Sequence, residues 1–273
     1  MQSGGLRTKG ITKSSRPGEP LISVVTVVYN GAETLGQTIR SVTEQTYGNV
    51  EYVIIDGGST DGTLDIIRKH EDKIDFWRSE PDGGIYDAMN KGIALATGDF
   101  LIFLGADDVF IHPSTLGRCA RRMTDAGTNY YGDAYFSRSR LIYDYKFSAL
   151  KLCVMNICHQ SVFYSRESLK GRRFDTGYPI YADWELNIEL WSASPFTYIP
   201  ETVCVFSEEG SSSRGDGAFL RDQKKIIRRN FGMPALVLYM LLRGPYNVWH
   251  FFEHLLSSRR YRFQAAAVTA EKS

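Results

Sequence analysis

Two adjacent carboxylates, Asp107 and Asp108, follow the fully apolar run 100–104 after Gly105 and Ala106. Neighbouring carboxylates repel each other unless a cation lies between them or water screens them. A Mg²⁺ or Mn²⁺ ion held by carboxylates neutralises charge on a departing diphosphate. The pair therefore indicates either a metal site for a phosphate-bearing ligand or a solvated turn that caps a helix before Val109.

A third carboxylate, Asp56, follows the apolar run 52–55 and opens a loop of small residues, 57–63. A carboxylate there could accept a hydrogen bond from the N–H of a nucleobase. The glycines of the loop let the backbone approach a ligand closely. Taken alone, such a loop is more often a strand-to-helix turn, and its combination with Asp107 and Asp108 is what favours a ligand site.

The segments around these aspartates alternate between strand and helix patterns. Continuous apolar runs predict strands, and apolar residues at helical spacing predict helices. The predicted strands are 22–29, 52–55, 74–77 and 100–104, and the predicted helices are 33–45, 64–70 and 85–96. This alternation is typical of an α/β fold with a mainly parallel sheet flanked by helices. Ligands bind beyond the carboxyl ends of such strands, so Tyr29, Asp56 and Asp107 are expected along one edge.

The composition narrows the class of protein. Thirty-two Lys and Arg residues balance thirty-one Asp and Glu residues, which argues against a nucleic-acid partner. The four cysteines lack zinc-ligand spacing and are interpreted as reduced or buried thiols. Residues 1–20 are polar and basic without an apolar signal segment, so we expect them to be disordered and the protein to be cytoplasmic.

Four motifs in order carry a family resemblance. They are Ile-Ser-Val-Val-Thr-Val-Val-Tyr-Asn at 22–30, Ile-Ile-Asp-Gly-Gly-Ser-Thr-Asp-Gly-Thr at 54–63, Gly-Ile-Tyr-Asp-Ala-Met-Asn-Lys-Gly-Ile at 84–93 and Phe-Leu-Gly-Ala-Asp-Asp at 103–108. This run resembles family 2 glycosyltransferases of the GT-A fold. Within the family it is most similar to bacterial enzymes of exopolysaccharide, capsule and lipopolysaccharide assembly, including the colanic-acid type.

The resemblance implies a nucleotide-sugar site. Val27 and Tyr29 would flank the nucleobase, and Asp56 would contact the base, usually uracil. Asp107 and Asp108 would share the ribose and the metal. The remaining members of the implied nucleotide-sugar set are Glu33 and Lys91.

Two positions depart from the pattern of many relatives. Gly105 stands where Asp is common, in an Asp-x-Asp-Asp motif. Met89 stands where many relatives have Arg near the diphosphate, and Lys91 is the predicted replacement for that charge.

The segment Tyr181-Ala-Asp-Trp-Glu-Leu186 resembles the acidic segment in which the family carries its general base. Inversion at a sugar's anomeric carbon needs such a base to accept the proton of the acceptor hydroxyl. Asp183 is the candidate, and Glu185 is the fallback, with Trp184 on the acceptor side. Without the resemblance, Asp183 would be interpreted as a helix N-terminal carboxylate.

Two further segments are candidates for the acceptor or diphosphate side. His159 and Gln160 match a recurring Cys-His-Gln segment, although a lone His among apolar residues is more often a core residue. Residues 211–214, Ser-Ser-Ser-Arg, resemble a loop that closes on donor phosphates, and a solvated linker is the alternative.

The C-terminal part combines basic and apolar residues. The apolar stretch 231–242 is too short to cross a bilayer, which takes about 20 residues. Basic residues on both sides, with aromatic residues near 249–252, predict either a peripheral membrane contact through 221–262 or buried packing helices.

The resemblance divides the chain into a GT-A catalytic domain, 21–214, and a helical C-terminal extension, 215–273. Residues 21–110 form the nucleotide-sugar half of the domain. Residues 111–214 form the acceptor half, where short aromatic strands are predicted at 130–131, 141–145 and 161–164.

The predicted function is that of a metal-dependent, hexosyltransferase-type enzyme at the inner face of the cytoplasmic membrane. It would move a sugar, with inversion, from a UDP-sugar to a hydroxyl of a glycan or lipid-linked saccharide in cell-surface polysaccharide synthesis. One alternative is a catalytically inactive nucleotide-sugar-binding scaffold. The other is a sugar nucleotidyltransferase, which would need a positively charged loop after the first strand, and 29–33 contains no such charge.

Overall fold

The computed structural model describes residues 1–143, 145–208 and 215–260, with side chains up to residue 241 in the last range. The strands are β1 (Gln2–Gly4), β2 (Ile22–Val28), β3 (Val50–Asp56), β4 (Phe76–Ser79), β5 (Phe100–Gly105), β6 (Val109–Phe110), β7 (Tyr130–Phe136), β8 (Leu141–Tyr143), β9 (Val162–Ser165) and β10 (Thr197–Phe206). The α-helices are α1 (Leu35–Thr43), α2 (Thr63–Lys69), α3 (Ile85–Leu95), α4 (Thr115–Ala120), α5 (Ala149–Val154), α6 (Ala182–Ala193) and α7 (Gly217–Arg260). Short 3₁₀ helices are η1 (Leu6–Lys9), η2 (Glu71–Lys73) and η3 (His159–Ser161).

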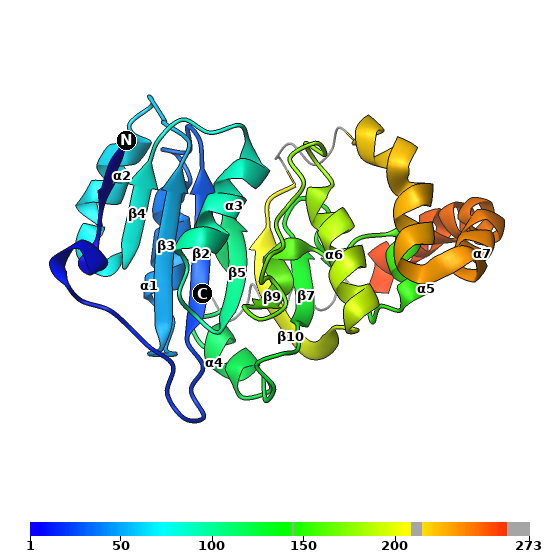
Figure 1. Cartoon of the computed structure of the whole chain (residues 1–273), viewed down its shortest axis with the longest axis horizontal. Helices are drawn as coiled ribbons and strands as arrows, with labels where there is room; N and C mark the ends of the chain where they lie inside the picture. Colours follow the sequence, from blue (N-terminus) through cyan, green and yellow to red (C-terminus); the bar gives the residue numbers. More distant parts are fainter. Residues whose placement is uncertain (144, 209–214, 261–273) are drawn as a thin grey trace.

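The strands form one mixed sheet in the order β1-β4-β3-β2-β5-β9-β7-β10-β6, with β8 beside β7. The central strands β4, β3, β2 and β5 are parallel, as the sequence predicts, and Figure 1 shows them side by side. The register pairs Val28 with Asp56, Asp56 with Ser79, and Val27 with Gly105. The ends of four strands therefore lie along one edge of the sheet.

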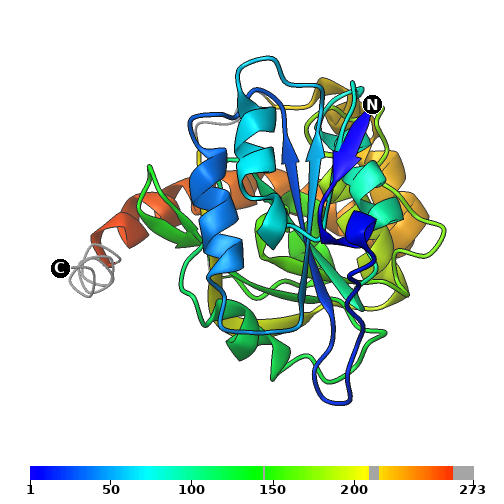
Figure 2. The ribbon, with the colours of Figure 1, turned by 90° about the vertical axis from the view of Figure 1, so that its left-hand side faces the viewer.

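Helices cover both faces of the parallel half. In β2, Val24 and Val28 pack into one core cluster with α1, whereas Val25 and Val27 pack into a second cluster with α3. Successive strand side chains point to opposite faces, so an apolar run is buried on both sides only when helices cover both. Figure 2 shows α1 and α3 on opposite sides of the strands. The α/β fold class is confirmed.

The expectation that residues 1–20 are disordered is wrong for the first part of this segment. β1 pairs antiparallel with β4, from Gln2 opposite Ser79 to Gly4 opposite Trp77. Arg7 Nη1 lies 2.9 Å from Glu51 Oε1. An exposed sheet edge presents unpaired backbone groups, which a polar segment can satisfy as well as an apolar one. Composition alone does not reveal this pairing.

Several elements of the second half carry no clear pattern in the sequence. In α6, residues on every side of the helix are buried, so the apolar periodicity that marks a surface helix is absent. In β10, Pro200 interrupts the strand pattern, and the pairing with β7 has register shifts between Tyr198 and Cys204. Both elements are defined by their tertiary neighbours.

The helical C-terminal part is present as α7, which is broken at Gly232, where φ is 80° and ψ is −179°. No helix in the described part of the chain combines the length and the hydropathy that a bilayer span requires. The predicted closing loop 211–214 and the end of the chain, 261–273, lie outside the described residues.

Candidate active site

Asp56 ends β3 and organises the loop that follows it. Its Oδ2 accepts hydrogen bonds from Ser79 Oγ (2.6 Å) and the Gly58 N–H (3.3 Å), and its Oδ1 accepts one from Ser59 Oγ (2.5 Å). The carboxyl group is fully buried. A nucleobase N–H would reach Asp56 only by sharing it with Ser59 or displacing that residue.

The loop after β2 is tied to the loop after β3. Asn30 adopts a positive φ of 50°, and its Oδ1 accepts a hydrogen bond from Thr60 N (2.9 Å). The backbone N–H of Asn30 donates to Ser59 Oγ (2.7 Å), and that of Ala32 donates to Asp61 Oδ2 (2.9 Å). These reciprocal bonds fix the two loops relative to each other at the edge where Asp56 lies.

The predicted base-flanking residues have different surroundings. The Tyr29 side chain is 67% exposed, so its ring is available for stacking. The Val27 side chain is buried in the core cluster that packs against α3. Glu33 is exposed just before α1.

The aspartate pair after β5 divides into one exposed and one buried carboxylate. Asp107 is exposed and Asp108 is buried. Asp108 Oδ2 accepts hydrogen bonds from Gly105 N (2.9 Å) and Gln160 Nε2 (3.0 Å), and Oδ1 accepts one from Ser207 N (3.1 Å). Burial raises the pKa of Asp108, the nearby Asp107 charge raises it further, and these hydrogen bonds partly offset the rise.

Gly105 leaves room for both carboxylates. A Cβ atom at this position would lie 2.9 Å from Asp108 Oδ2 and 3.0 Å from Asp107 Oδ1. A side chain here would therefore press on both carboxylates. The departure from the Asp-x-Asp-Asp pattern is compatible with the geometry of the pair.

The carboxylates of Asp107 and Asp108 fit a divalent cation that also binds a diphosphate ligand. Among the residues that the structure describes, no three His, Cys, Asp or Glu side chains form a group that could hold a metal ion. Mg²⁺ is commonly bound by one or two carboxylates together with substrate phosphates, so two carboxylates suffice for a cation completed by a diphosphate. Asp107 would be the exposed ligand in such an arrangement, and Asp108 would add negative charge behind it.

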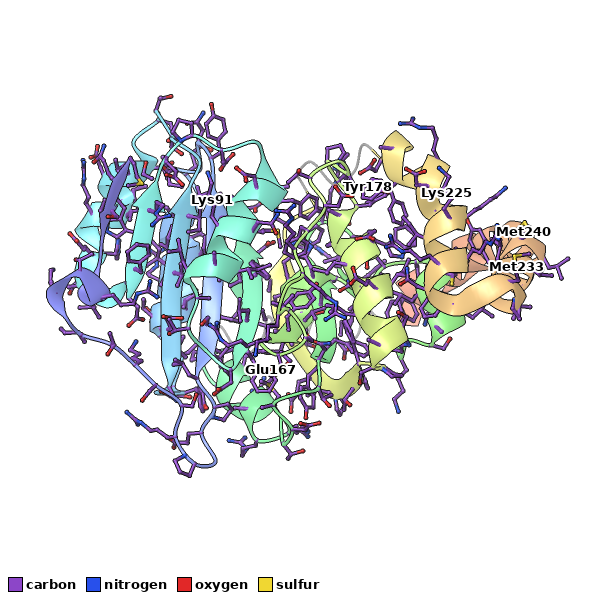
Figure 3. All side chains as sticks on the ribbon, in the orientation of Figure 1. Lys91, Glu167, Tyr178, Lys225, Met233 and Met240 are labelled. Carbon is purple, nitrogen blue, oxygen red and sulfur yellow. The ribbon has the colours of Figure 1, made fainter. Side chains whose placement is uncertain are left out.

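Lys91 is paired with two carboxylates. Its Nζ is 3.4 Å from Asp87 Oδ2 and 3.5 Å from Glu80 Oε1, and Figure 3 shows Lys91 on α3. Met89, on the same helix, is fully buried in the core and supplies no charge to a ligand.

Asp183, at the start of α6, is buried and accepts hydrogen bonds from several elements. Oδ1 lies 2.9 Å from the Tyr86 hydroxyl and from the backbone N of Trp184. Oδ2 lies 2.9 Å from Asn156 Nδ2 and from His159 Nδ1. The carboxylate is therefore held in one orientation by groups from α3, α6 and the segment before β9.

The neighbouring candidates point away from this network. Trp184 is buried, donates from Nε1 to the Leu152 carbonyl (2.6 Å) and stacks on Phe219. Glu185 Oε1 lies 2.7 Å from Arg229 Nη2. Burial raises the pKa of Glu185, and the Arg229 charge counteracts that rise.

Tyr86, Asn156 and Asp82 belong to these surroundings but were not singled out from the sequence. Tyr86 lies within a quoted motif, yet its position indicates only a helix, and Asn156 lies in a loosely patterned segment. Asp82 lies over Gly57, whose Cβ would be 2.6 Å from Asp82 Oδ2. Its only sequence signal is the turn-forming run Pro-Asp-Gly-Gly at 81–84.

Known proteins match most of the chain. A PGL/p-HBAD biosynthesis glycosyltransferase of Mycobacterium tuberculosis is 35% identical over 238 residues, which cover 83% of this chain and 91% of that protein. An uncharacterised glycosyltransferase of the same organism is 31% identical, over 76% of this chain and 83% of that one.

Solved structures with the same fold have lower sequence identity. Residues 1–349 of Staphylococcus aureus TarS with UDP-GlcNAc match 81% of this chain with a TM-score of 0.61 and 18% identity, and this chain covers 66% of that structure. It covers only 39% of a longer TarS chain. The mannosyltransferase PcManGT of Pyrobaculum calidifontis, with GDP-Man and Mn²⁺, matches 95% of this chain and 86% of that chain with a TM-score of 0.58 and 18% identity.

The family model described as glycosyl transferase family 2 matches residues 23–176, more than half of the chain and nearly all of the parallel sheet. Together with the relatives, this match shows that the chain belongs to glycosyltransferase family 2 and has the GT-A fold.

Proposed function

We propose that the protein is an inverting, metal-dependent glycosyltransferase of the hexosyltransferase type. It transfers a sugar from a nucleoside diphosphate sugar to a hydroxyl of a glycan or lipid-linked saccharide in cell-surface polysaccharide synthesis. The observation that carries this proposal is the placement of Asp56 and Asp107 at the ends of β3 and β5, on either side of β2. These positions offer carboxylates to the two ends of one nucleoside diphosphate.

On the donor side, Tyr29 stacks on the nucleobase, and Asp56 accepts a hydrogen bond from the base once Ser59 shares or leaves the carboxylate. Asp107 and Asp108 hold Mn²⁺ or Mg²⁺ together with the diphosphate, and the bound cation neutralises the charge that develops on the leaving group. Lys91 is ion-paired with Glu80 and Asp87, so its proposed contact with the diphosphate requires it to leave those partners.

On the acceptor side, Asp183 is the general base that accepts the proton of the acceptor hydroxyl. Its position is fixed by hydrogen bonds to Tyr86, Asn156 and His159. Glu185, the alternative, is paired with Arg229. That ion pair favours Asp183 over Glu185 for this role.

UDP is the proposed donor nucleotide. One related fold is known with UDP-GlcNAc and another with GDP-Man, so the fold accommodates more than one base. The narrower resemblance to colanic-acid enzymes rests on the motifs alone.

A thermal-shift titration with UDP, GDP and CDP, each with and without Mn²⁺, tests the donor side, because a ligand that binds the folded state raises Tm. We expect UDP with Mn²⁺ to give the largest rise, and Asp107→Ala to abolish the metal-dependent part. Asp72→Ala, at an exposed aspartate on η2, is the control and should leave the rise unchanged. The absence of a rise with every nucleotide would contradict the proposal.

Release of nucleoside diphosphate from donor in the presence of acceptor separates the enzyme from an inactive scaffold. Binding without release with any acceptor would favour the scaffold. A sugar nucleotidyltransferase would instead act on a nucleoside triphosphate and release pyrophosphate.

We also propose that α7 contacts the membrane surface from the cytoplasmic side. After the break at Gly232, Met233, Val237 and Leu241 are 50%, 44% and 68% exposed. Figure 3 shows Met233 and Met240 on the part of α7 that follows the break. The exposed basic residues of the preceding segment are Arg221, Lys224, Lys225, Arg228 and Arg229. Apolar side chains beside cationic ones match an anionic bilayer surface.

Sedimentation with phosphatidylglycerol vesicles at low salt tests this contact. The variant Met233→Asp with Met240→Asp should sediment less than the unmodified protein. Ile11→Asp, which changes an exposed apolar residue near the N-terminus, should sediment as the unmodified protein does. Equal sedimentation of all three proteins would contradict a contact through α7.

A further inference from the structure

The 3₁₀ turn η3 carries side chains that reach both acidic centres of the site. Gln160 Nε2 donates to Asp108 Oδ2 at 3.0 Å, and His159 Nδ1 lies 2.9 Å from Asp183 Oδ2. His159 and Gln160 are consecutive residues. One short turn therefore ties the proposed general base to the aspartates of the proposed metal site.

Gln160 lies in the interior, and both ends of its amide are engaged. The residue is 5% exposed. Its Oε1 accepts a hydrogen bond from the Cys158 thiol (3.1 Å), while its Nε2 donates to Asp108. An ionised carboxylate can only accept hydrogen bonds, so the amide NH₂ has to face Asp108 and the carbonyl oxygen has to face the thiol. The amide is therefore directed at Asp108 rather than at a ligand.

The Asp108 carboxylate is held by donors from three parts of the chain. Its Oδ2 accepts from the Gly105 N–H (2.9 Å) and from Gln160, and its Oδ1 accepts from the Ser207 N–H (3.1 Å). An ionised carboxylate offers about four lone-pair positions, so one position, on Oδ1, is left for a cation or for a water bound to it. Of these three donors, only Gln160 uses its side chain. It is therefore the donor that a substitution can remove.

We infer that Gln160 is a positioning residue of the metal site, which holds the Asp108 carboxylate in the orientation that binds a divalent cation together with Asp107. This inference rests on the proposed metal-dependent transfer. Asp107 and Asp108 repel each other until a cation binds. The hydrogen bond from Gln160 opposes rotation of Asp108 away from its neighbour, because the amide is itself anchored at Cys158. Gln160 acts on the cation through Asp108 and does not contact the ligand.

The variant Gln160→Met tests the inference, because methionine cannot donate to Asp108 and substitutions that conserve volume are tolerated best in a core. Loss of a hydrogen-bond partner of a metal ligand typically costs about 10–100-fold in metal affinity. We expect the Kd of Mn²⁺, measured by calorimetry in the presence of UDP, to rise by that factor, while the Kd of UDP without metal stays unchanged. Gln160→Asn keeps the amide but shortens the side chain, and as a second variant it should also raise the Kd of Mn²⁺.

Gln223→Met is the matched control. Gln223 on α7 is 3% exposed, its Nε2 donates to the Cys153 carbonyl (3.0 Å), and its Oε1 accepts from the Tyr239 hydroxyl (2.9 Å). It is therefore a buried amide engaged at both ends, like Gln160, but without a contact to the aspartate pair. Both variants lose the hydrogen bonds of a buried amide and should lower Tm, whereas only Gln160→Met should change the Kd of Mn²⁺. An unchanged Kd in both variants would show that Gln160 has a structural role alone and would overturn the inference.

A double-mutant cycle with Asp108→Asn separates an action through Asp108 from a direct contact with the ligand. Substitutions that affect one shared interaction are not additive. Gln160→Met should therefore change the Kd of Mn²⁺ little once Asp108 has been replaced. Fully additive effects on the free energy of Mn²⁺ binding would mean that Gln160 acts on the ligand directly, and the inference would be wrong. If the unmodified protein shows no Mn²⁺-dependent binding of UDP, the proposed function fails instead.

Discussion

Replacing Gly105 with alanine tests whether the geometry of the aspartate pair depends on the absence of a side chain at position 105. The backbone tolerates the change, because Gly105 is not among the glycines with positive φ. The new Cβ would lie 2.9 Å from Asp108 Oδ2 and 3.0 Å from Asp107 Oδ1, closer than carbon and oxygen normally pack. Asp107 is exposed and can rotate away, whereas Asp108 is buried and held by three hydrogen bonds.

The strain therefore falls on Asp108. Moving its Oδ2 lengthens the 2.9 Å bond from the Gly105 N–H, which is one of three bonds to a buried carboxylate. Weakening a hydrogen bond to a buried charged group costs about 1–3 kcal/mol. For a domain of this size, each kcal/mol corresponds to roughly 2–4 °C in Tm. We expect a lower Tm and a fall in Mn²⁺-dependent UDP affinity.

Urea unfolding measures the stability, and calorimetry with UDP and Mn²⁺ measures the affinity. Gly36→Ala is the matched control, because Gly36 lies in α1 and its nearest atom would be the Arg40 guanidinium at 3.8 Å. Alanine is favoured over glycine in a helix by about 0.5–1 kcal/mol, so this control should be slightly more stable. If Gly105→Ala keeps both stability and affinity, the crowding of the aspartate pair has no energetic consequence and the reasoning is refuted.

Three further predictions concern stability. Burial raises the pKa of Glu51, but hydrogen bonds to its carboxylate outweigh burial and lower the pKa overall. The ionised carboxylate therefore stabilises the folded protein above about pH 4.5, and this contribution is lost as pH falls through the pKa of the folded state. Glu51→Gln should lower the stability to urea at pH 7 but have little effect at pH 3. Burial raises the pKa of Glu185 despite the Arg229 charge, so the unmodified protein loses stability as pH rises above about 4.5. The stability of Glu185→Gln relative to the unmodified protein should therefore increase between pH 4 and pH 7. A stability difference that stays constant over this range would contradict the prediction. Gly4→Val places a Cβ 2.6 Å from Trp77 Nε1 and should displace β1, seen as red-shifted tryptophan emission, whereas unchanged emission would show that β1 adapts.

The donor half could be predicted in detail because its signals are local. Strands 22–29, 52–55 and 100–104 lie within one or two residues of β2, β3 and β5. Each is a short apolar run buried on both faces, and each ends in or is followed within two residues by a polar residue at the edge of the sheet. The predicted strand 74–77 overlaps β4 (Phe76–Ser79) only at its first two residues, and the burial of β4 alternates along the strand instead of forming the continuous apolar run that marks the other three.

The acceptor half and the N-terminal segment could not be predicted to the same degree. α6 is buried around its whole circumference, so its burial follows from what packs against it rather than from periodicity. The first residues were expected to be disordered, yet β1 pairs with the sheet edge through backbone groups that composition does not describe. In both cases the deciding interactions join residues far apart in the chain.

The sequence by itself determined the fold class, the family and the aspartates at the strand ends, because parallel strands bring their carboxyl ends to one edge whatever packs elsewhere. Only the tertiary structure decided how those aspartates differ. Burial and three hydrogen bonds distinguish Asp108 from the exposed Asp107, and four donors from three segments of the chain surround Asp183. Exposure and hydrogen bonding depend on neighbours distant in sequence, and these properties decide which group can bind a cation or accept a proton.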